Sequence, residues 1–553
     1  MTNSIADIVE QANAFFIIGS NTTEQHPVIG IQIRQAVKER GAKVILADPR
    51  RLDLADIAAI HLMHRPGTDI ALLNGLVNVI IAEELWDKTF VESRTEGFDE
   101  LKSAVARYTP EHAAAITGVP ADDIRQAARL LATTKPASLL YAMGITQHVS
   151  GHQNVLSCAN LQMLLGNVGV PGGGVNPLRG QNNVQGACDM GGLPNVYTGY
   201  QVVTSDASRA RFEQAWGVPL SDEIGLTLVH MMNNAETGQV KAMYVIGENP
   251  MMSDPDVNHV KKCLESLEFL VVQDIFLTET ARLADVVLPA ASFAEKDGTF
   301  TNTERRVQRV HKAIEPVGES RADWVILRDL AQRTQVHLAA LDPHWEAKQD
   351  AQYASWNYTH PSEVMEEIAA LTPAYGAISY QRLEEESLQW PCPTADHPGT
   401  RILHVGRFSR GIGQFSAVEW QPPAEEPDQE YPFILTTGRV LQHFHTGSMT
   451  RRVDGLEYLE PEERLHIHPS DASRLGLVDG DWTLVASRRG QVRVRARVTH
   501  QVQPGLVFLT FHFAEALGNV LTIAALDPVA EIPELKVCAV KVQAAPQGEE
   551  KGV

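Results

Sequence analysis

Residues 15–21, FFIIGSN, and residues 243–249, MYVIGEN, are two versions of one pattern, an apolar run that ends in Gly-x-Asn. Such a run is typical of a buried parallel strand, and the glycine is typical of the tight turn that follows it. Each copy continues through a helical stretch to a second apolar strand that ends in an acid, Asp48 in the first copy and Asp274 in the second. An Ala-Asp-hydrophobic segment follows in both copies. The repeat predicts two similar nucleotide-binding units and one ligand with two nucleotide ends.

Within each unit the glycine would let the backbone approach a phosphate, and the following helix would offer free N–H groups and its positive end. The acid would accept hydrogen bonds from ribose hydroxyls or a base edge. After the first copy, Ile29 and Ile33 share one helical face, and Gly41 stands where a left-handed helix end is expected. Neither unit has a complete Gly-x-Gly-x-x-Gly, so a doubly wound sheet that binds no ligand is the alternative.

Composition narrows the class of protein. The chain has 553 residues, more than one hydrophobic core usually serves, so several domains are expected. A formal net charge of −21 argues against a nucleic-acid partner, and no apolar run has the length of a membrane span. The five cysteines lack Cys-x-x-Cys spacing, which excludes a local iron–sulfur or zinc motif and favours a reducing compartment. With no signal-peptide pattern at its start, we expect a cytoplasmic protein without direct membrane insertion.

Changes of pattern along the chain predict the domain organisation. Strands alternate with helices in the first part, and the period-two stretch at 492–498 indicates a β-barrel near the end. A proline-rich stretch at 421–427 marks a connection between domains. The predicted fold class is α/β, with two doubly wound dinucleotide-binding-like domains followed by a C-terminal β-barrel. The predicted segments are two α/β domains at 1–135 and 136–330, a connecting region at 331–425, the barrel at 426–543 and a polar tail at 544–553.

Three stretches are too polar to be core. Loop 172–192 gathers glycines and amides around Arg179, whose planar guanidinium could hold a carboxylate by two parallel hydrogen bonds; a solvated flexible loop is the alternative. Segment 436–452 places arginines, two histidines and hydroxyls after a strand and could clamp an anion or cofactor, although solvated side chains beside a turn would give the same pattern. The stretch 519–536 fits a polar site and a capped turn with a closing strand equally well.

These residues carry a resemblance. Over nearly its whole length the chain resembles the molybdopterin-dependent formate dehydrogenase catalytic subunit of the dimethyl-sulfoxide-reductase superfamily, and the run 174–190 is the most specific part of the likeness. The resemblance implies a bis-molybdopterin guanine dinucleotide cofactor with molybdenum or tungsten, held by the two α/β units under a barrel of the double-psi type. It implies oxidation of formate to CO₂ and electron transfer to iron–sulfur or NAD-linked subunits.

Two other functions remain as alternatives. One is another molybdopterin oxidoreductase of the nitrate reductase type, against which the run 179–183, RGQNN, weighs. The other is a noncatalytic scaffold subunit that binds the cofactor or only a partner chain.

The family's functional residues are carried over by position. Arg179 would orient formate, Gln181 would lie next to the pterin, and no residue of this chain is assigned to the metal. Ser20, Gly67 and Asn249 belong to the same cofactor-binding motifs as the residues that follow. One guanine dinucleotide would be held by Gly19, Asn21, Asp48, Arg50 and Asp69; the other pterin and its nucleotide by Gly144, Gln147, Gly247, Glu248, Gln273 and Asp274; and Arg439, His443, His445, Asn519 and Lys536 would close over the cofactor from the barrel.

The sequence also departs from the family. In the family an N-terminal domain carries a four-cysteine [4Fe-4S] cluster, and the metal-ligating cysteine or selenocysteine with its adjacent histidine comes just before the stretch that resembles residues 1–5. These residues are not in the sequence as written, and Cys188 matches a family position other than the metal ligand. We therefore expect a chain that lacks this region and does not turn over formate by itself. An in-frame UGA codon for selenocysteine, read as a stop, would produce such a start.

The DNA upstream of Met1 tests this expectation. We expect the upstream frame to encode a four-cysteine motif, and then Cys-His, or a UGA codon followed by His, close before Met1. Sequencing the region is the measurement, and an unrelated gene or an intergenic region there would contradict it.

Overall fold

The structure is a computed structural model that describes residues 1–341 and 356–546. The chain divides into two compact units. The first unit contains residues 1–180, 250–262 and 402–546, and the second contains 181–249 and 263–401. Neither unit is one continuous segment, because the chain passes between them after Gly180, Asn249, Lys262 and Arg401.

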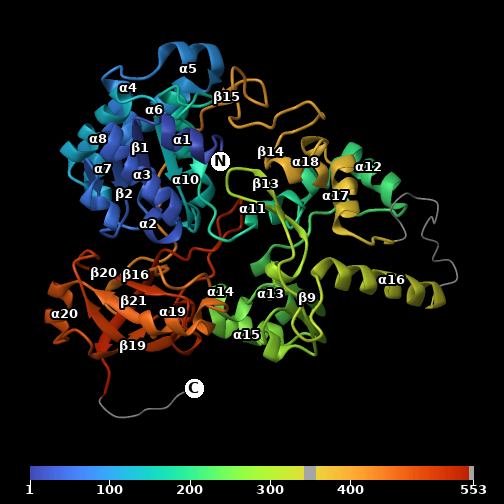
Figure 1. Ribbon diagram of the computed structural model, residues 1–553. Helices are drawn as coiled ribbons and strands as arrows, with labels where there is room; N and C mark the ends of the chain where they lie inside the picture. Colours follow the sequence, from blue (N-terminus) through green and yellow to red (C-terminus); the bar gives the residue numbers. More distant parts are fainter. Residues whose placement is uncertain (342–355, 547–553) are drawn as a thin grey trace. The chain divides into compact units, whose positions relative to one another are not determined.

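A five-stranded parallel sheet organises the first half of the first unit (Figure 1). Residues 14–18 and 44–47, in two of its strands, are continuous apolar runs because helices cover both faces. Phe16 and Ile18 pack on the side of α4 (Asp69–Ala82), α7 (Pro110–Thr117) and α8 (Ala121–Thr133), whereas Phe15 and Ile17 pack on the side of α1 (Ile5–Gln11) and α3 (Pro27–Arg40). The strand order is β3 (Ile60–Leu62), β2 (Lys43–Ala47), β1 (Ala14–Ile18), β5 (Ala137–Tyr141), β6 (Val175–Pro177).

Local sequence signals correctly predicted where helix α3, which follows β1, ends. The predicted stop at Gly41 is confirmed, because α3 ends at Arg40 and Gly41 adopts a φ of 70°. The other elements of this part are α2 (Thr22–Gln25), α5 (Lys88–Arg94), α6 (Phe98–Val105), α9 (Met143–Thr146), α10 (Gly151–Leu164), and the strand pair β4 (Thr95–Glu96) and β15 (Gly413–Gln414).

Strand β5 belongs to the first sheet, where it pairs in parallel with β1 from Ala14↔Ala137 to Ile18↔Tyr141. The first α/β part therefore extends to Gly180, beyond the boundary near 135 that the sequence pattern predicts. The difference has a physical reason: a strand's own residues specify burial, and the sheet that it joins is decided by contacts with strands more than a hundred residues away.

The turns after β1 and β5 touch each other. The Gly144 N–H donates to the Gly19 carbonyl at 3.1 Å, and a Cβ on Gly144 would lie 2.6 Å from the Gly19 Cα. Gly19 also has a φ of 57°, which side-chain-bearing residues rarely adopt. The glycine that the sequence assigns to phosphate approach is thus needed for the contact between two backbone turns.

The second unit repeats half of the first sheet. Its parallel strands are ordered β11 (Val286–Pro289), β10 (Phe269–Asp274), β9 (Ala242–Ile246), which matches the order β3-β2-β1 and confirms the repeat seen in the sequence. A separate antiparallel sheet contains β12 (Gly298–Thr301), β13 (Arg306–Val310) and β14 (Leu388–Gln389). The other elements are α11 (Val184–Asp189), β7 (Val196–Tyr197), β8 (Gln201–Val202), α12 (Asp206–Trp216), α13 (Leu228–Glu236), α16 (Asp323–Leu341), α17 (Pro361–Leu371) and α18 (Tyr380–Glu385).

The predicted connecting region is more ordered than its weak pattern suggests. Its residues Tyr375, Ile378 and Leu383 form a small apolar core with Val307 of β13. The part of this region at 342–355 lies outside the described residues. Helix α14 (Pro250–Ser253) and most of α15 (Val257–Glu265) belong to the first unit.

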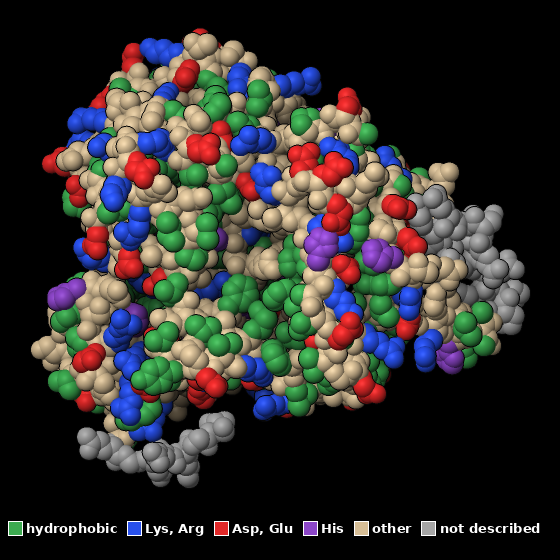
Figure 2. Space-filling model, viewed as in Figure 1, with side chains coloured by type: hydrophobic (Ala, Val, Ile, Leu, Met, Phe, Trp, Pro, Cys, Tyr) green, Lys and Arg blue, Asp and Glu red, His purple; other side chains and the backbone are tan. Residues whose placement is uncertain are grey.

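The predicted C-terminal barrel is confirmed as a closed barrel of six strands. Along β19 the small apolar residues Val492, Val494 and Ala496 are buried, and the arginines between them face outward. Figure 2 shows basic side chains gathered over the barrel. In barrel order the strands are β16 (Phe433–Gly438), β20 (Leu506–Thr510), β17 (Arg464–Ile467), β19 (Gln491–Val498), β18 (Trp482–Ala486) and β21 (Cys538–Ala544), with α19 (Asp454–Leu459) and α20 (Pro469–Leu475) between them.

Most of the predicted tail, 547–553, lies outside the described residues. In the parts of the chain that the structure does describe, no helix combines the length and the apolarity that crossing a membrane requires.

The turn contact predicts a stability difference between two glycine substitutions. Gly19→Ala forces a Cβ to within 2.7 Å of the Gly144 carbonyl carbon at a positive φ, whereas Gly41→Ala adds a Cβ at a positive φ with nothing within 4 Å. Gly41→Ala should cost about 1–2 kcal/mol, the strain of the left-handed conformation alone. Gly19→Ala should lower the thermal unfolding midpoint by clearly more. Equal midpoints would contradict the contact.

Candidate functional site

A cavity of about 230 Å³ lies in the first unit, between the carboxyl ends of β1 and β2 and the barrel. The turn after β1 and the segment after β2 line one side, and the loop after β16 lines the other. Three residues that the resemblance assigns to the cofactor, Asn21, Arg50 and Arg439, meet here. The lining residues are Asn21, Thr23, Glu24, Arg50, Arg51, Leu52, Asp53, Arg439, Val440, Leu441, Gln442, Glu460, His466, Arg497, Gln501 and Phe508.

Cationic side chains concentrate at this cavity. The Arg50 guanidinium stacks 4.0 Å from the centre of the Phe508 ring. Arg439 lies 5.8 Å and 5.7 Å from the ring centres of Phe444 and Phe511, and burial lowers its pKa to about 10. Such a cluster of partly buried cations is suited to an anion with several negative oxygens, such as a diphosphate.

Lys536 adds a titratable cation beside these arginines. Its Nζ donates to the Thr437 carbonyl at 2.7 Å. Burial, reinforced by the nearby charges of Arg50 and Arg439, lowers its pKa to about 7. The ammonium form is therefore disfavoured until a negative group arrives.

Several buried polar atoms around the turn after β1 find no hydrogen-bond partner among the described residues. They are the hydroxyls of Ser20, Thr22 and Thr23 and Nδ1 of His26 and His466. Burial lowers the pKa of His466 to about 3, with further lowering by Arg497, so its ring is neutral and Nδ1 can accept or donate. Because buried polar groups are normally satisfied, these atoms fit a polar ligand such as a nucleotide.

Acidic groups occupy defined places in the same region. Asp48 is buried after β2, and its Oδ1 accepts from the Arg50 backbone N–H at 2.9 Å. Asn21 caps α2 and donates to Glu24 Oε2 at 2.7 Å, while burial raises the pKa of Glu24. A buried carboxyl of this kind is a chemically suitable acceptor for the N–H edge of a base.

Arg179 follows β6 at the same edge of the sheet. Its backbone carbonyl is 2.7 Å from His26 Nε2, and burial lowers the pKa of His26, so the neutral ring donates through Nε2. A Cβ on the neighbouring Gly180 would lie 3.2 Å from the Arg439 guanidinium nitrogens. The barrel arginine thus packs against the turn that carries Arg179, and the two cations share one region.

The carboxylate of Asp69 is engaged by other protein groups. Its Oδ1 pairs with His64 Nε2 at 3.0 Å, its Oδ2 lies 3.9 Å from His148 Nε2, and both histidines are buried. Burial alone would raise the pKa of Asp69, but the His64 charge and hydrogen bond outweigh it and lower the pKa. Asp69 is among the described residues that do not line the cavity, and its assignment to a nucleotide stays a prediction.

Gly67, Gly144 and Gln147 are engaged within the protein. The Gly67 carbonyl accepts a hydrogen bond from Trp420 Nε1 at 2.8 Å. Gly144 contacts Gly19 as described, and its carbonyl also contacts His148 Nε2 at 2.9 Å. Gln147 ends α9.

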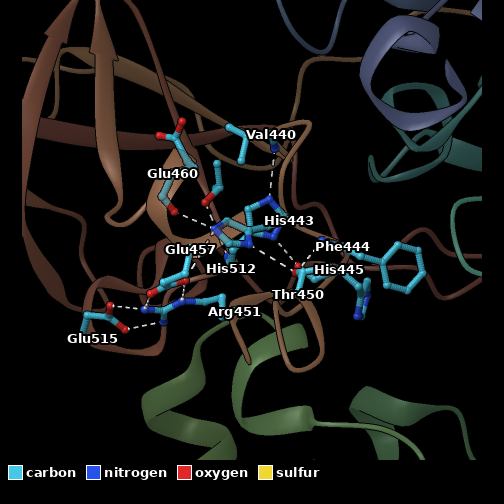
Figure 3. Close-up of polar contacts among 11 residues, drawn as sticks. Val440, His443, Phe444, His445, Thr450, Arg451, Glu457, Glu460, His512 and Glu515 are labelled. Carbon is cyan, nitrogen blue, oxygen red and sulfur yellow. Dashed lines mark hydrogen bonds and ion pairs between the residues drawn. The ribbon is translucent and has the colours of Figure 1, made fainter. Parts of the chain in front are cut away.

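The clamp loop, residues 439–452, is fixed by two histidines (Figure 3). His443 is buried, with Nε2 2.7 Å from the Glu460 carbonyl and Nδ1 3.2 Å from Thr450 Oγ1. His512, from the segment after β20, contacts the Val440 N–H and the His445 carbonyl. Burial, aided by the Arg439 charge, lowers the pKa of His445 to about 4. His443 thus shapes the loop, and Arg439 is the loop's cation at the cavity.

Asn519 is fully buried beside the barrel. Its Nδ2 donates to the Met252 and Ser253 carbonyls at 2.8 Å and 3.1 Å, so the amide attaches α14 to the barrel. Its Oδ1 finds no partner among the described residues, which leaves an acceptor for a ligand.

The remaining predicted residues belong to the second unit. Gly247 has a φ of 63° with nothing within 4 Å of a Cβ position, and its N–H donates to the Gln273 carbonyl at 2.8 Å. Asn249 links the turn after β9 to Thr280 and Glu279. Gln273 is buried and donates to Asp323 Oδ1 at 2.6 Å, Asp274 accepts from the Ile275 N–H, and Gln181 and Glu248 are partly exposed.

Sequence reasoning missed His466, Arg497, Phe508 and His512. His466 and Phe508 sit in short apolar strands with no spacing signal, and Arg497 is one of three alternating arginines that look alike in sequence. The FHF stretch at 511–513 gave no indication that its histidine reaches the clamp loop. The alternation along β19 is the one signal that could have drawn attention to Arg497.

Comparison with known proteins identifies the class. The chain belongs to the molybdopterin oxidoreductase family: the family model described as "Molybdopterin oxidoreductase" matches residues 1–333, and that of the "Molydopterin dinucleotide binding domain" matches residues 433–539. The F420-dependent formate dehydrogenase subunit alpha of Methanocaldococcus jannaschii is 50% identical over 98% of this chain and 78% of the relative, and formate dehydrogenase H of Escherichia coli is 40% identical over 98% and 74%. Acetylene hydratase from Pelobacter acetylenicus shares the fold, with a TM-score of 0.74 and 24% identity over 98% of this chain and 79% of that one.

The low pKa of Lys536 predicts a proton taken up on anion binding. Near pH 8 the lysine is mostly neutral in the free protein, and an adjacent anion restores its charge, so binding of inorganic diphosphate should be accompanied by uptake of about one proton. Calorimetry in two buffers with different ionisation enthalpies measures this number.

Lys536→Met is the control, since it keeps the stem and removes the titrating group. Subtracting its proton uptake removes the contribution of diphosphate itself. Uptake that is identical in the two proteins would contradict the assignment of the proton to Lys536.

Proposed function

We propose that this chain is the C-terminal portion of the formate dehydrogenase subunit that binds bis-molybdopterin guanine dinucleotide and oxidises formate to CO₂. The observation that carries the proposal is the partly buried cation cluster at the cavity, with Arg179 next to it, in a chain 50% identical to a relative named as a formate dehydrogenase alpha subunit. Each formate would release CO₂, one proton and two electrons.

The residues at the cavity fit one nucleotide end of the cofactor. Arg50, Arg439 and Arg497, with Lys536 behind them, would neutralise the diphosphate. Asp48 would accept from ribose hydroxyls, and the unpartnered hydroxyls after β1 would bond the remaining polar atoms. Because the second unit repeats the strand order and the Gly-x-Asn turn, we propose that Gly247, Glu248 and Asp274 serve the other nucleotide. When bound, the cofactor supplies the redox chemistry, with molybdenum or tungsten as its metal.

Arg179 would bind and orient the formate carboxylate. A guanidinium can make two parallel hydrogen bonds to a carboxylate, which fixes the direction of its C–H bond, and formate offers little other surface to hold. Arg439 adds a second positive charge beside the same turn, and the neutral His26 supports the Arg179 backbone. Gln181, two residues on, would lie next to the pterin.

The electrons need an acceptor outside this chain. We propose an electron-accepting iron–sulfur or NAD-linked subunit as partner. Two relatives are named F420-dependent formate dehydrogenases, so F420 is a second electron acceptor to test beside NAD. Action in the cytoplasm stays a prediction, as does the expectation that the chain alone does not turn over formate.

The substrate role of Arg179 is tested by Arg179→Lys in the complete enzyme. Lysine keeps the charge but cannot reproduce the two parallel hydrogen bonds, so kcat/KM for formate should fall by about 10²-fold with a raised KM, equivalent to about 2.7 kcal/mol. Dye-linked formate oxidation gives the rates, and metal and guanine analysis gives the cofactor content, which should stay near normal.

Arg129→Lys is the matched control, because Arg129 lies on α8 and forms an exposed ion pair with Glu83, which caps the end of α4. Arg129→Lys should change neither kcat/KM for formate nor the cofactor content. A wild-type kcat/KM for Arg179→Lys, or a loss that follows lost cofactor, would mean that Arg179 is structural.

A further inference from the structure

The clamp loop depends on side chains from elsewhere for its shape. It supplies residues 439–442 to the cavity, yet from Arg439 to Met449 it contains neither helix nor strand. Backbone groups in such a segment must be satisfied by turns, side chains or water. The orientation of Arg439 is therefore set by whatever holds the backbone next to it.

His512 holds that backbone. Its side chain is fully buried after β20, Nε2 accepts from the Val440 N–H at 3.1 Å, and Nδ1 is within hydrogen-bond distance of the His445 carbonyl. Figure 3 shows the ring between these two points of the loop. One imidazole thus spans the loop from the residue after Arg439 to His445.

The two contacts require one tautomer. Because the Val440 N–H points at Nε2, that nitrogen must carry a lone pair, and the proton sits on Nδ1 and is donated to the His445 carbonyl. Burial lowers the pKa of His512 to about 3; the bond to His445 acts in the opposite direction, and the charges of His443 and Arg439 lower it further. The neutral ring is thus a fixed two-point brace across physiological pH.

The other contacts of the loop lie farther from Arg439. His443 contacts Thr450 and the Glu460 carbonyl, and Arg451 pairs with Glu457 and Glu515 at distances of 2.8–3.2 Å. Desolvation alone shifts the pKa of Arg439, and no carboxylate contributes to the shift. The partly buried guanidinium is therefore positioned by the backbone that carries it and by the ring faces of Phe444 and Phe511.

We propose that His512 is a positioning residue, which holds Arg439 at the cavity in the orientation that an incoming diphosphate requires. This inference rests on the proposed function for the identity of the ligand. It goes beyond that function by assigning the affinity for the anion partly to a side chain that does not line the cavity.

Two substitutions separate the two hydrogen bonds. His512→Asn can keep the donor near Nδ1 but is too short to reach Val440, whereas His512→Gln can present its amide oxygen near the position of Nε2. We expect the Asn variant of the full chain to bind inorganic diphosphate about 10-fold more weakly, and the Gln variant to stay within about 3-fold of wild type. Hydrogen exchange of peptides covering 439–446 should speed up in the Asn variant and change little in the Gln variant.

A double-mutant cycle tests whether the effect passes through Arg439. In an Arg439→Ala background, His512→Asn should weaken diphosphate binding no further, because the group that it positions is gone. Leu509→Ala, which removes buried side-chain volume from the barrel core on β20, the strand that precedes His512, is the control for general destabilisation. It should lower the unfolding midpoint without changing diphosphate affinity.

The outcomes test the positioning role of His512 separately from the nucleotide assignment of the cavity. Additive losses in the cycle, or equal losses for Asn, Gln and Leu509→Ala, would overturn the positioning role. An unchanged rate of hydrogen exchange at 439–446 in the Asn variant would also overturn the positioning role, whatever the diphosphate affinity of that variant. Binding of diphosphate with no binding of GDP would contradict the nucleotide assignment and leave the role of His512 standing.

Discussion

The backbone contact between Gly19 and Gly144 is the constraint on which the site depends. The first sheet grows from β1 toward β3 on one side and toward β6 on the other, so the turns after β1 and β5 diverge at the carboxyl edge where open α/β sheets bind ligands. A hydrogen bond of 3.1 Å ties these turns together. Because Asp48 follows β2 and Arg179 follows β6 at the same edge of the sheet, residues more than a hundred positions apart reach one region.

The barrel adds partly buried cations to those of the sheet edge, in a chain whose net charge is −21. Burying a guanidinium or an ammonium costs free energy unless something compensates. Ring faces compensate in part, since Arg50 stacks on Phe508 and Arg439 lies near Phe444 and Phe511. The lowered pKa values of Arg439 and Lys536 show that the compensation is incomplete, which is the state expected of a site whose counter-charge is a ligand.

Local patterns in the sequence carried much of the fold. The repeated apolar run that ends in Gly-x-Asn predicted two similar units, whose strand orders match. The alternation of apolar and charged residues at 492–498 predicted the barrel. Family likeness placed Asn21, Arg50 and Arg439 at what proved to be one cavity. The sequence did not predict that β5 joins the first sheet, that His64 pairs with Asp69, or that His512 bridges the clamp loop. Each of these depends on contacts between residues of different segments, which leave no periodic pattern in the sequence.

The interleaving of the two units governs how the chain can fold as it is made. The first unit takes residues 1–180, then 250–262, and is completed only by the segment from 402 onward. Its sheet can form early, since all five strands lie before residue 180, but the barrel side of the cavity emerges last. The sheet edge with Gly19, Asp48 and Arg179 must therefore wait, uncovered, while more than two hundred residues are synthesised. A cofactor would meet an open sheet edge first and the complete cavity only after the barrel has been synthesised.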